Sequence, residues 1–138
     1  TGDVYNTGIT KSHSGLATSH DGYNWTWEGD IMSPPDKGWD QYAARLGTIV
    51  WTPPVFVGLY DGSHDVSENY EERCGLATSA DLRTWRRLTV AGPWVMSPHG
   101  TGSVRYMDVL ADGESWLYYY EMVRADGSHD LRVQRVAS

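Results

Sequence analysis

The chain has 138 residues, of which 40% are apolar, and its formal net charge at pH 7 is −7. That length suits one ordinary domain, and the small number of basic residues (11) argues against binding to nucleic-acid phosphates. No apolar run approaches the roughly 20 residues that span a bilayer. The composition therefore predicts neither a nucleic-acid partner nor a membrane partner.

Strands dominate the expected structure, because much of the apolar volume comes from 7 tryptophans and 9 tyrosines, which favour pleated surfaces. The first two strands are expected over Ser12–Ser19 and Trp25–Ile31. Asp21 and Gly22 between them supply turn geometry. Trp25 is expected to return into the core on the second strand.

The middle of the chain predicts four further strands. They are expected over Tyr42–Trp51, Val55–Tyr60, Glu71–Ser79 and Trp85–Val90. Pro53-Pro54 breaks the first pair, a polar loop is expected from Asp61 to Tyr70, and Asp81–Thr84 forms a second turn. Trp85, like Trp25, is expected to pack in the core.

The last third of the chain begins with a long loop from Gly92 to Gly102. Three strands are expected after it, over Ser103–Leu110, Ser115–Val123 and Leu131–Ser138. Ala111-Asp112-Gly113-Glu114 is a hairpin signal between the first two. Helical spacing of apolar residues is not evident in the sequence, so the predicted class is all-β.

An internal repeat organises these elements. Gly75–Ser79, followed by Asp81 and Trp85, repeats Gly15–Ser19 with its Asp21 and Trp25, at an offset of 60 residues. The same offset relates three further pairs: Arg45 and Arg105, Tyr60 and Tyr120, Asp61 and Glu121. Val136–Ser138 is a degraded third copy. Four short antiparallel strands in a unit of this length are typical of a β-propeller blade.

These segments resemble a known superfamily. The residues that carry the resemblance are the repeated Gly-Leu-Ala-Thr-Ser-x-Asp-x-x-x-Trp, Tyr60-Asp61-Gly62, Glu68–Arg73, Arg105–Asp108 and Tyr119–Glu121. The sequence is similar to the five-bladed β-propeller glycoside hydrolases, which include arabinanases, β-xylosidases and invertase-type enzymes. It resembles most closely bacterial proteins described only as glycosyl-hydrolase-like. The resemblance implies a partial, roughly half-length member.

The resemblance also implies an incomplete ring of about two to two and a half blades. Residues 1–32 are expected to end one blade, 40–92 to form a full blade, and 100–138 to form an incomplete third; Thr1-Gly2 aligns with Asp61-Gly62. Open sheet edges favour association. We therefore expect a homo-oligomer in which a terminal strand of one copy completes a sheet of another. The alternative is a shortened chain that has settled into a smaller all-β fold.

In such propellers, carboxylates near the innermost strands carry the chemistry. Glycoside hydrolysis uses two carboxyl groups across the scissile bond, one of which must hold a proton. The candidate catalytic residues are Asp108, Glu121 and Asp61. The candidate sugar-binding residues are Arg45, Arg105, Glu72 and Trp51. Trp39 and Trp116 offer further aromatic faces for stacking on a sugar ring.

Other interpretations of these residues remain open. The two arginines with Asp61 and Glu121 also fit ion pairs repeated in each blade, and the run Glu68–Arg73 also fits a solvated loop. The acid motifs of the enzyme families, Glu-Gly-Pro or Glu-Cys, are not found on the expected inner strands, and the resemblance implies that the first blade, which carries a catalytic Asp in those families, is missing. The sequence thus predicts a carbohydrate-active, glycosyl-hydrolase-like protein, or alternatively a non-catalytic carbohydrate-binding or self-assembling fragment.

Metal and cofactor chemistry has little support in the sequence. The five histidines show no metal-ligand spacing, and no twelve-residue calcium loop is present. We therefore expect neither a metal nor a cofactor. The single cysteine, Cys74, excludes an intrachain disulfide and is expected to be a small buried hydrophobic side chain.

Overall fold

The computed structural model describes residues 5–137, and within them the only helical element is one short 3-10 turn. The nine strands are β1 (Ser14–Ser19), β2 (Trp25–Met32), β3 (Ala43–Thr52), β4 (Val55–Ser63), β5 (Arg73–Ser79), β6 (Arg86–Arg87), β7 (Val104–Ala111), β8 (Ser115–Val123) and β9 (His129–Ala137). The 3-10 turn η1 covers Val66–Glu68. The predicted all-β class is confirmed.

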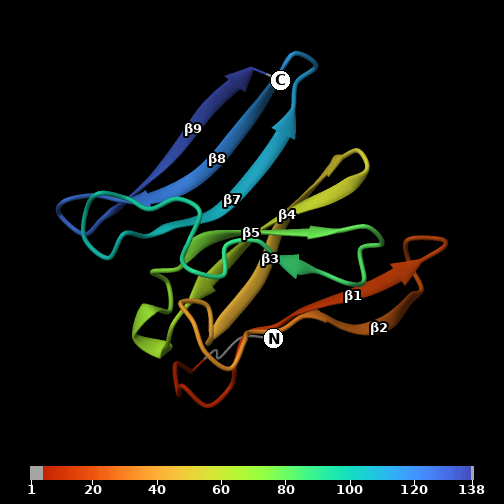
Figure 1. The fold of residues 1–138 in the computed structure, drawn as a ribbon, viewed down its shortest axis with the longest axis horizontal. Coiled ribbons are helices and arrows are strands. Elements are labelled where there is room, and N and C mark those ends of the chain that lie inside the picture. The colour runs from red at the N-terminus through yellow and green to blue at the C-terminus, as the bar shows by residue number, and fades with distance from the viewer. Residues whose placement is uncertain (1–4, 138) are drawn as a thin grey trace.

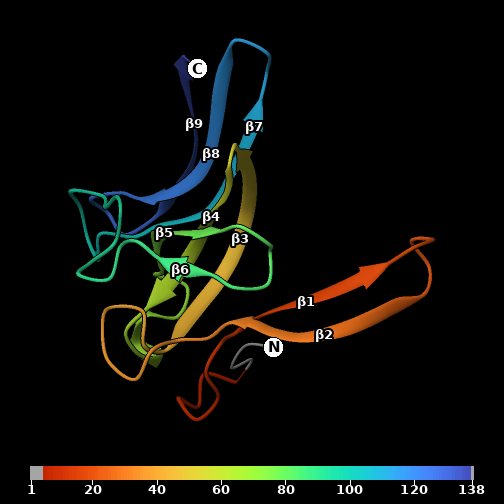
Figure 2. The same ribbon diagram turned by 45° about the vertical axis from the view of Figure 1, so that its right-hand side comes forward.

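The strands form two sheets. β1 and β2 make a two-stranded antiparallel sheet, which reaches away from the other strands in both views (Figures 1 and 2). In the larger sheet, β3, β4, β5 and β6 form one antiparallel section, and β7, β8 and β9 form another. The two sections are joined by a single parallel pair, Arg73 with Val104.

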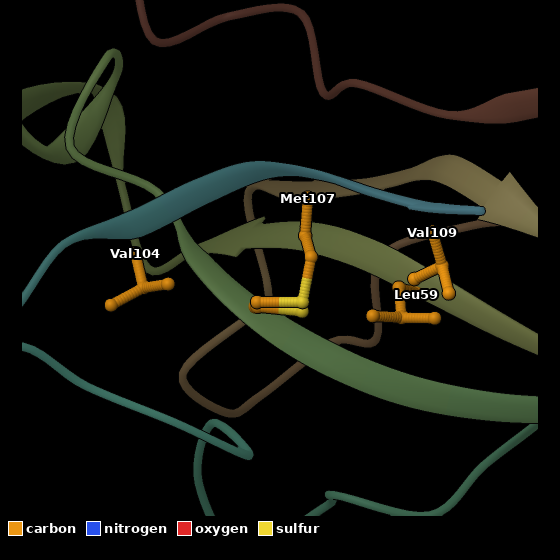
Figure 3. Packing of buried hydrophobic residues seen from close by; sticks show 5 residues of the cluster. Leu59, Val104, Met107 and Val109 are labelled. Atoms are coloured by element: carbon orange, nitrogen blue, oxygen red, sulfur yellow. The ribbon is translucent and has the colours of Figure 1, made fainter. Parts of the chain in front are cut away.

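The main apolar core lies where these two sections face each other. Leu59 and Cys74 come from β4 and β5, and Val104, Met107 and Val109 come from β7. Figure 3 shows the three β7 side chains projecting from the same side of their strand, with Leu59 below Val109. Full burial of a side chain of this size contributes about 1.5–3 kcal/mol. Cys74 is 1% exposed, as the sequence predicts.

A second core cluster connects the hairpin to the larger sheet. Met32 of β2 packs with Ala44, Tyr60 and Ala77 of β3, β4 and β5. Tyr60 donates a hydrogen bond to the buried Asp40 (2.8 Å). The base of the hairpin is therefore held in place, while its tip extends into solvent.

The two repeated turns have the same hydrogen bonds. In each, the serine hydroxyl accepts backbone N–H groups two and three residues later, the aspartate carboxylate accepts two further N–H groups, and the indole N–H donates to a carbonyl three residues back. The residues are Ser19, Asp21 and Trp25 in the first turn, and Ser79, Asp81 and Trp85 in the second. The 60-residue offset in the sequence therefore corresponds to equivalent local structures.

The surroundings of the two tryptophans differ, and the prediction for Trp25 is wrong. Trp85 is half-buried against the second cluster and lies over Gly58, where a Cβ would come within 2.6 Å of its ring. Trp25 is 63% exposed. The reason is that β1 pairs with no strand other than β2 among the described residues, so nothing covers the Trp25 ring.

Two strand boundaries also differ from the sequence prediction. β4 continues through Asp61 to Ser63, because Asp61 and Gly62 pair with Cys74 and Arg73 of β5. The outer strand expected over Trp85–Val90 is reduced to the two residues of β6. Thr1-Gly2, and Ser138 of the third repeat copy, lie outside the described residues.

Candidate functional site

The candidate site begins with two equivalent cross-strand pairs. Arg45 of β3 lies opposite Asp61 of β4, and Arg105 of β7 lies opposite Glu121 of β8. In both β3 and β7 the strand register becomes irregular close after the arginine. The irregularity lies between Leu46 and Thr48 in β3 and between Arg105 and Asp108 in β7. The offset found in the sequence thus places two arginines and two carboxylates in matching positions.

Glu72 lies between the two arginines. It directly precedes β5 and is 0% exposed. One carboxylate oxygen, Oε1, is paired with Arg45 Nη2 and accepts the Tyr70 N–H (3.1 Å). The other, Oε2, lies 3.9 Å from Arg105 Nη1. We call Arg45, Asp61, Glu72, Arg105 and Glu121 the arginine–carboxylate cluster.

Two buried atoms of this cluster have unused hydrogen-bonding capacity. Glu72 Oε2 and Arg105 Nη1 are both buried, and neither has a hydrogen-bond partner within the described residues. A buried polar atom without a partner costs free energy. The pair therefore presents one acceptor and one donor, about 3.9 Å apart, to any group that reaches both.

Asp61 is the cluster's candidate proton carrier. It is 6% exposed, and its Oδ1 accepts the Tyr106 backbone N–H (3.0 Å). Burial raises its pKa to about 6; the Tyr106 hydrogen bond acts in the opposite direction, and the charge of Glu72 adds to the increase. A carboxyl group with this pKa can hold or release a proton near neutral pH.

Glu121 is the more accessible carboxylate. Its Oε2 accepts a hydrogen bond from Arg105 Nε (3.0 Å) and forms an ion pair with Arg105 Nη2 (2.9 Å), and its side chain is 35% exposed. Burial opposes the charge on Arg105, but the hydrogen bond to Glu121 and the neighbouring negative charges outweigh burial and raise the Arg105 pKa. The ion-pair interpretation thus holds for Arg105 with Glu121, whereas the ion pair of Arg45 is with Glu72.

Tyr106 belongs to this site although sequence reasoning did not select it. Its backbone has φ of +52°, which is rare for a residue with a side chain, and it lies in the β7 irregularity. The Arg105 guanidinium lies 4.7 Å from its ring centroid. The ring is 45% exposed beside the cluster. The available signal was its repeat position, where Leu46 stands in the other copy.

The run Glu68–Arg73 is only partly a solvated loop, since Tyr70 is 54% exposed but the charged residues at its end are not. Glu72 is fully buried, and Arg73 pairs with Glu68 at 2.9 Å and donates to the Thr101 carbonyl. The physical reason is that β5 begins at Arg73, so the preceding residue is inserted between the sheet sections. Glu72 and both arginines, which were selected from the sequence, are therefore brought together.

Two selected residues lie outside the cluster. Asp108 is exposed, lies opposite Tyr119, and its Oδ1 accepts the Val109 N–H (2.8 Å). Trp51 packs on Phe56, with centroids 4.5 Å apart, near the far end of β3. Six residues of strand separate it from Arg45, or roughly 20 Å. Trp39 and Trp116 pack against the core clusters.

The described residues contain no group of three or more histidine, cysteine, aspartate or glutamate side chains that could hold a metal ion. In the same part of the chain, no helix is long and apolar enough to cross a membrane. The cluster itself offers carboxylates and guanidinium groups, with the phenol of Tyr106 beside them.

Comparisons with solved structures find the same fold in glycoside hydrolases. A family 117 glycoside hydrolase produced by the marine bacterium Zobellia galactanivorans matches with a TM-score of 0.72 at 15% identity, over 91% of this chain and 38% of that chain. Another glycoside hydrolase matches with 0.65 at 17%, over 91% and 45%. Sucrose-6-phosphate hydrolase from Lactobacillus gasseri matches with 0.64 at 13%, over 90% and 25%.

This chain shares its fold with part of each of these glycoside hydrolases. The resemblance predicted from the sequence is confirmed at that level. The chain spans less than half the length of each of these structures. No family model and no curated protein sequence matches it.

Proposed function

We propose that this chain is a carbohydrate-active part of a β-propeller, and that the arginine–carboxylate cluster binds a sugar. The observation that carries the proposal is the pair of buried atoms Glu72 Oε2 and Arg105 Nη1, which form a 3.9 Å ion pair but have no hydrogen-bond partner among the described residues, in a fold shared with glycoside hydrolases. A sugar hydroxyl both donates and accepts, so one hydroxyl placed between the two atoms would satisfy both, once the side chains open to admit it. Tyr106 offers a half-exposed ring beside them.

The cluster also supports glycoside hydrolysis. Two carboxyl groups in different environments are the requirement for this reaction. Asp61, with its pKa raised to about 6 by burial, is suited to the acid role. Glu121, which is partly exposed and paired with Arg105, is suited to act as base or nucleophile. Asp108, the third carboxylate selected from the sequence, takes part only if a substrate reaches around the β7 irregularity.

We further propose the blade boundaries and the assembly. The hairpin β1–β2 ends one blade (residues 1–32), β3 to β6 form a full blade (40–92), and β7 to β9 form an incomplete third (100–138). Trp25 and Trp27 are exposed on the hairpin, and β9 pairs only with β8 among the described strands. A second copy that pairs with these edges would cover them.

Binding and turnover are tested separately. The full chain is incubated with 4-nitrophenyl α-L-arabinofuranoside and β-D-xylopyranoside, and binding of arabino- and xylo-oligosaccharides and sucrose is followed by calorimetry. We expect Glu121→Gln and Tyr106→Ala to weaken binding, whereas Asp36→Asn, at an exposed acid outside the cluster, leaves it unchanged.

Binding without turnover would support the non-catalytic alternative, in which the arginine–carboxylate cluster only recognises the sugar. If no saccharide binds, or if Asp36→Asn weakens binding as much as Glu121→Gln does, the proposed sugar site is wrong.

A further inference from the structure

Two adjoining apolar cavities lie beside Trp94: the larger is bounded by β7, β8, β9 and the loop at Trp94, and the smaller lies between the two sheet sections. The larger has a volume of about 440 Å³ and the smaller about 270 Å³, and both are lined by Trp94 and Tyr118. Val104 lines the larger cavity, and adjacent strand residues point to opposite faces. Arg105 therefore points away from it, and the larger cavity is distinct from the arginine–carboxylate cluster.

Strand alternation builds one wall of the larger cavity. Tyr118 and Met122 of β8 are four residues apart and share a face. Gln134 of β9 lies opposite Tyr118, and Val136 follows two residues later on the same face. These positions place aromatic, thioether and amide groups around one space.

The irregularity in β7 adds a further side chain to that wall. Val104 and Met107 are three residues apart, so regular alternation would put them on opposite faces. The irregularity between Arg105 and Asp108 changes the alternation, and both side chains line the cavity. Figure 3 shows both projecting from the same side of β7. The irregular backbone at Tyr106 thus places Met107 in the cavity wall and also places the Tyr106 N–H against Asp61 of the cluster.

We propose that the larger cavity binds a neutral aromatic ring that carries a hydroxyl or similar polar group. About 150 Å³ holds a benzene ring, so the cavity accommodates one or two substituted rings. The Trp94 and Tyr118 rings stand 6.3 Å apart and tilted by 53°, an arrangement that aromatic contacts favour. Met107 and Met122 supply thioether groups, which adapt to a ring and contact it favourably.

The lining also determines the charge of the ligand. Among the described residues that line this cavity, none carries a charge. An ionised ligand would lose its hydration without gaining a counter-charge, which is costly. Gln134 provides an amide that can donate to or accept from a hydroxyl on the ring. A neutral phenol or naphthol therefore fits better than an aromatic carboxylate.

The test uses the full chain labelled with ¹³C at the methionine methyl groups and titrated with 2-naphthol. We expect the NMR signals of Met107 and Met122 to shift with the same dissociation constant. The Met32 signal should stay unchanged, because Met32 is buried in the other core cluster. No shift at about 1 mM ligand, or equal shifts at Met32, would overturn the proposal.

A matched pair of variants locates the ligand. Val136→Trp fills the cavity from its partly exposed rim, and we expect it to weaken binding about tenfold or more. Val133→Trp places the same ring on the other face of β9 and should change binding less than about twofold. Circular dichroism checks the fold of both. Equal effects of the two variants would contradict the proposed position.

Ligand chemistry gives the last comparison. Cyclohexanol keeps the hydroxyl but lacks the aromatic ring, and 2-naphthoate keeps the rings but is charged. Both should bind about tenfold more weakly than 2-naphthol. Binding of cyclohexanol as tight as that of 2-naphthol would show that the cavity accepts any apolar group, and the aromatic assignment would be wrong.

Discussion

The Tyr106 backbone N–H donates to the Asp61 carboxylate across 3.0 Å, and this bond ties β7 to β4. The donor sits at a positive φ, and the acceptor is a buried carboxyl group whose pKa is raised to about 6. The protonation of Asp61 therefore bears on both the stability of the chain and the shape of the candidate site.

Asp61 predicts a pH dependence of stability. Its pKa is higher when folded (about 6) than the ordinary value of 3.8, so between these values the folded chain binds more protons. The contribution of Asp61 to the free energy of unfolding is fully present below about pH 4. It falls by on the order of 2–3 kcal/mol as the pH rises through about 6. Asp61→Asn cannot titrate, so urea unfolding should show the variant gaining stability relative to the parent chain between about pH 4 and 7.

Other carboxylates, whose pKa is lowered in the folded chain, make stability rise with pH. The quantity to measure is therefore the difference in stability between the parent chain and Asp61→Asn at each pH. A constant difference across this pH range would mean that burial does not raise the Asp61 pKa. Asp61→Ala serves as the control, since it leaves the Tyr106 N–H without its acceptor and should cost about 1–3 kcal/mol.

Glu72 predicts a large loss of stability on removal of its charge. Glu72→Gln leaves two arginines beside a buried neutral group, and breaking a buried ion pair costs about 3–5 kcal/mol. The double variant Arg45→Met with Glu72→Leu removes both charges of one pair and should cost less than Glu72→Gln alone. Denaturant unfolding measures the stability of the single and the double variant. If the double variant is less stable than Glu72→Gln, the loss of stability does not come from an arginine charge left without its Glu72 partner.

Substitution by alanine is expected to lower stability at one repeated tryptophan and to leave it nearly unchanged at the other. Trp85→Ala removes a half-buried ring that packs on Gly58 and should cost about 2–4 kcal/mol. Trp25→Ala removes an exposed ring and should change monomer stability by less than about 0.5 kcal/mol. If copies associate through the hairpin, Trp25→Ala should also lower the sedimentation-average mass at micromolar concentration. An unchanged mass in a chain that does associate would place the contact elsewhere.

Substitution of Asp108 tests whether the reaction centre lies in the arginine–carboxylate cluster or at Asp108. If a substrate of the glycoside panel is hydrolysed, Glu121→Gln and Asp61→Asn should lower kcat/KM by about a hundredfold or more. Asp108→Asn should lower it by less than about threefold, because Asp108 is exposed beyond the β7 irregularity. The reverse order of effects would move the reaction centre to the other side of β7.

The sequence predicted the parts of this structure that depend on local chemistry. The Ser-x-Asp turns repeat because their hydrogen bonds lie within a few residues of each other. Arg45 and Arg105 could be matched because one offset relates them. The exposed Trp25 could not be predicted, since its environment depends on which strand lies beside β1 and not on its own neighbours in the sequence.

Long-range contacts explain the remaining differences. Glu72 was selected for sugar binding, but its burial between two arginines follows from the packing of β5 against β7. Tyr106 was missed because its role comes from a backbone irregularity, and its repeat position, which matches Leu46, does not by itself reveal that irregularity. The apolar cavity beside Trp94 was not predicted for the same reason, since its walls come from a loop and three strands.

The single parallel pair of Arg73 and Val104 has a consequence for how the molecule unfolds. A backbone ladder that narrows to one residue pair transmits little cooperativity, so the β3–β6 and β7–β9 sections are coupled mainly by their side chains. Amide protons in the two sections are then expected to exchange as separate units, and a ligand that bridges them would merge these units into one.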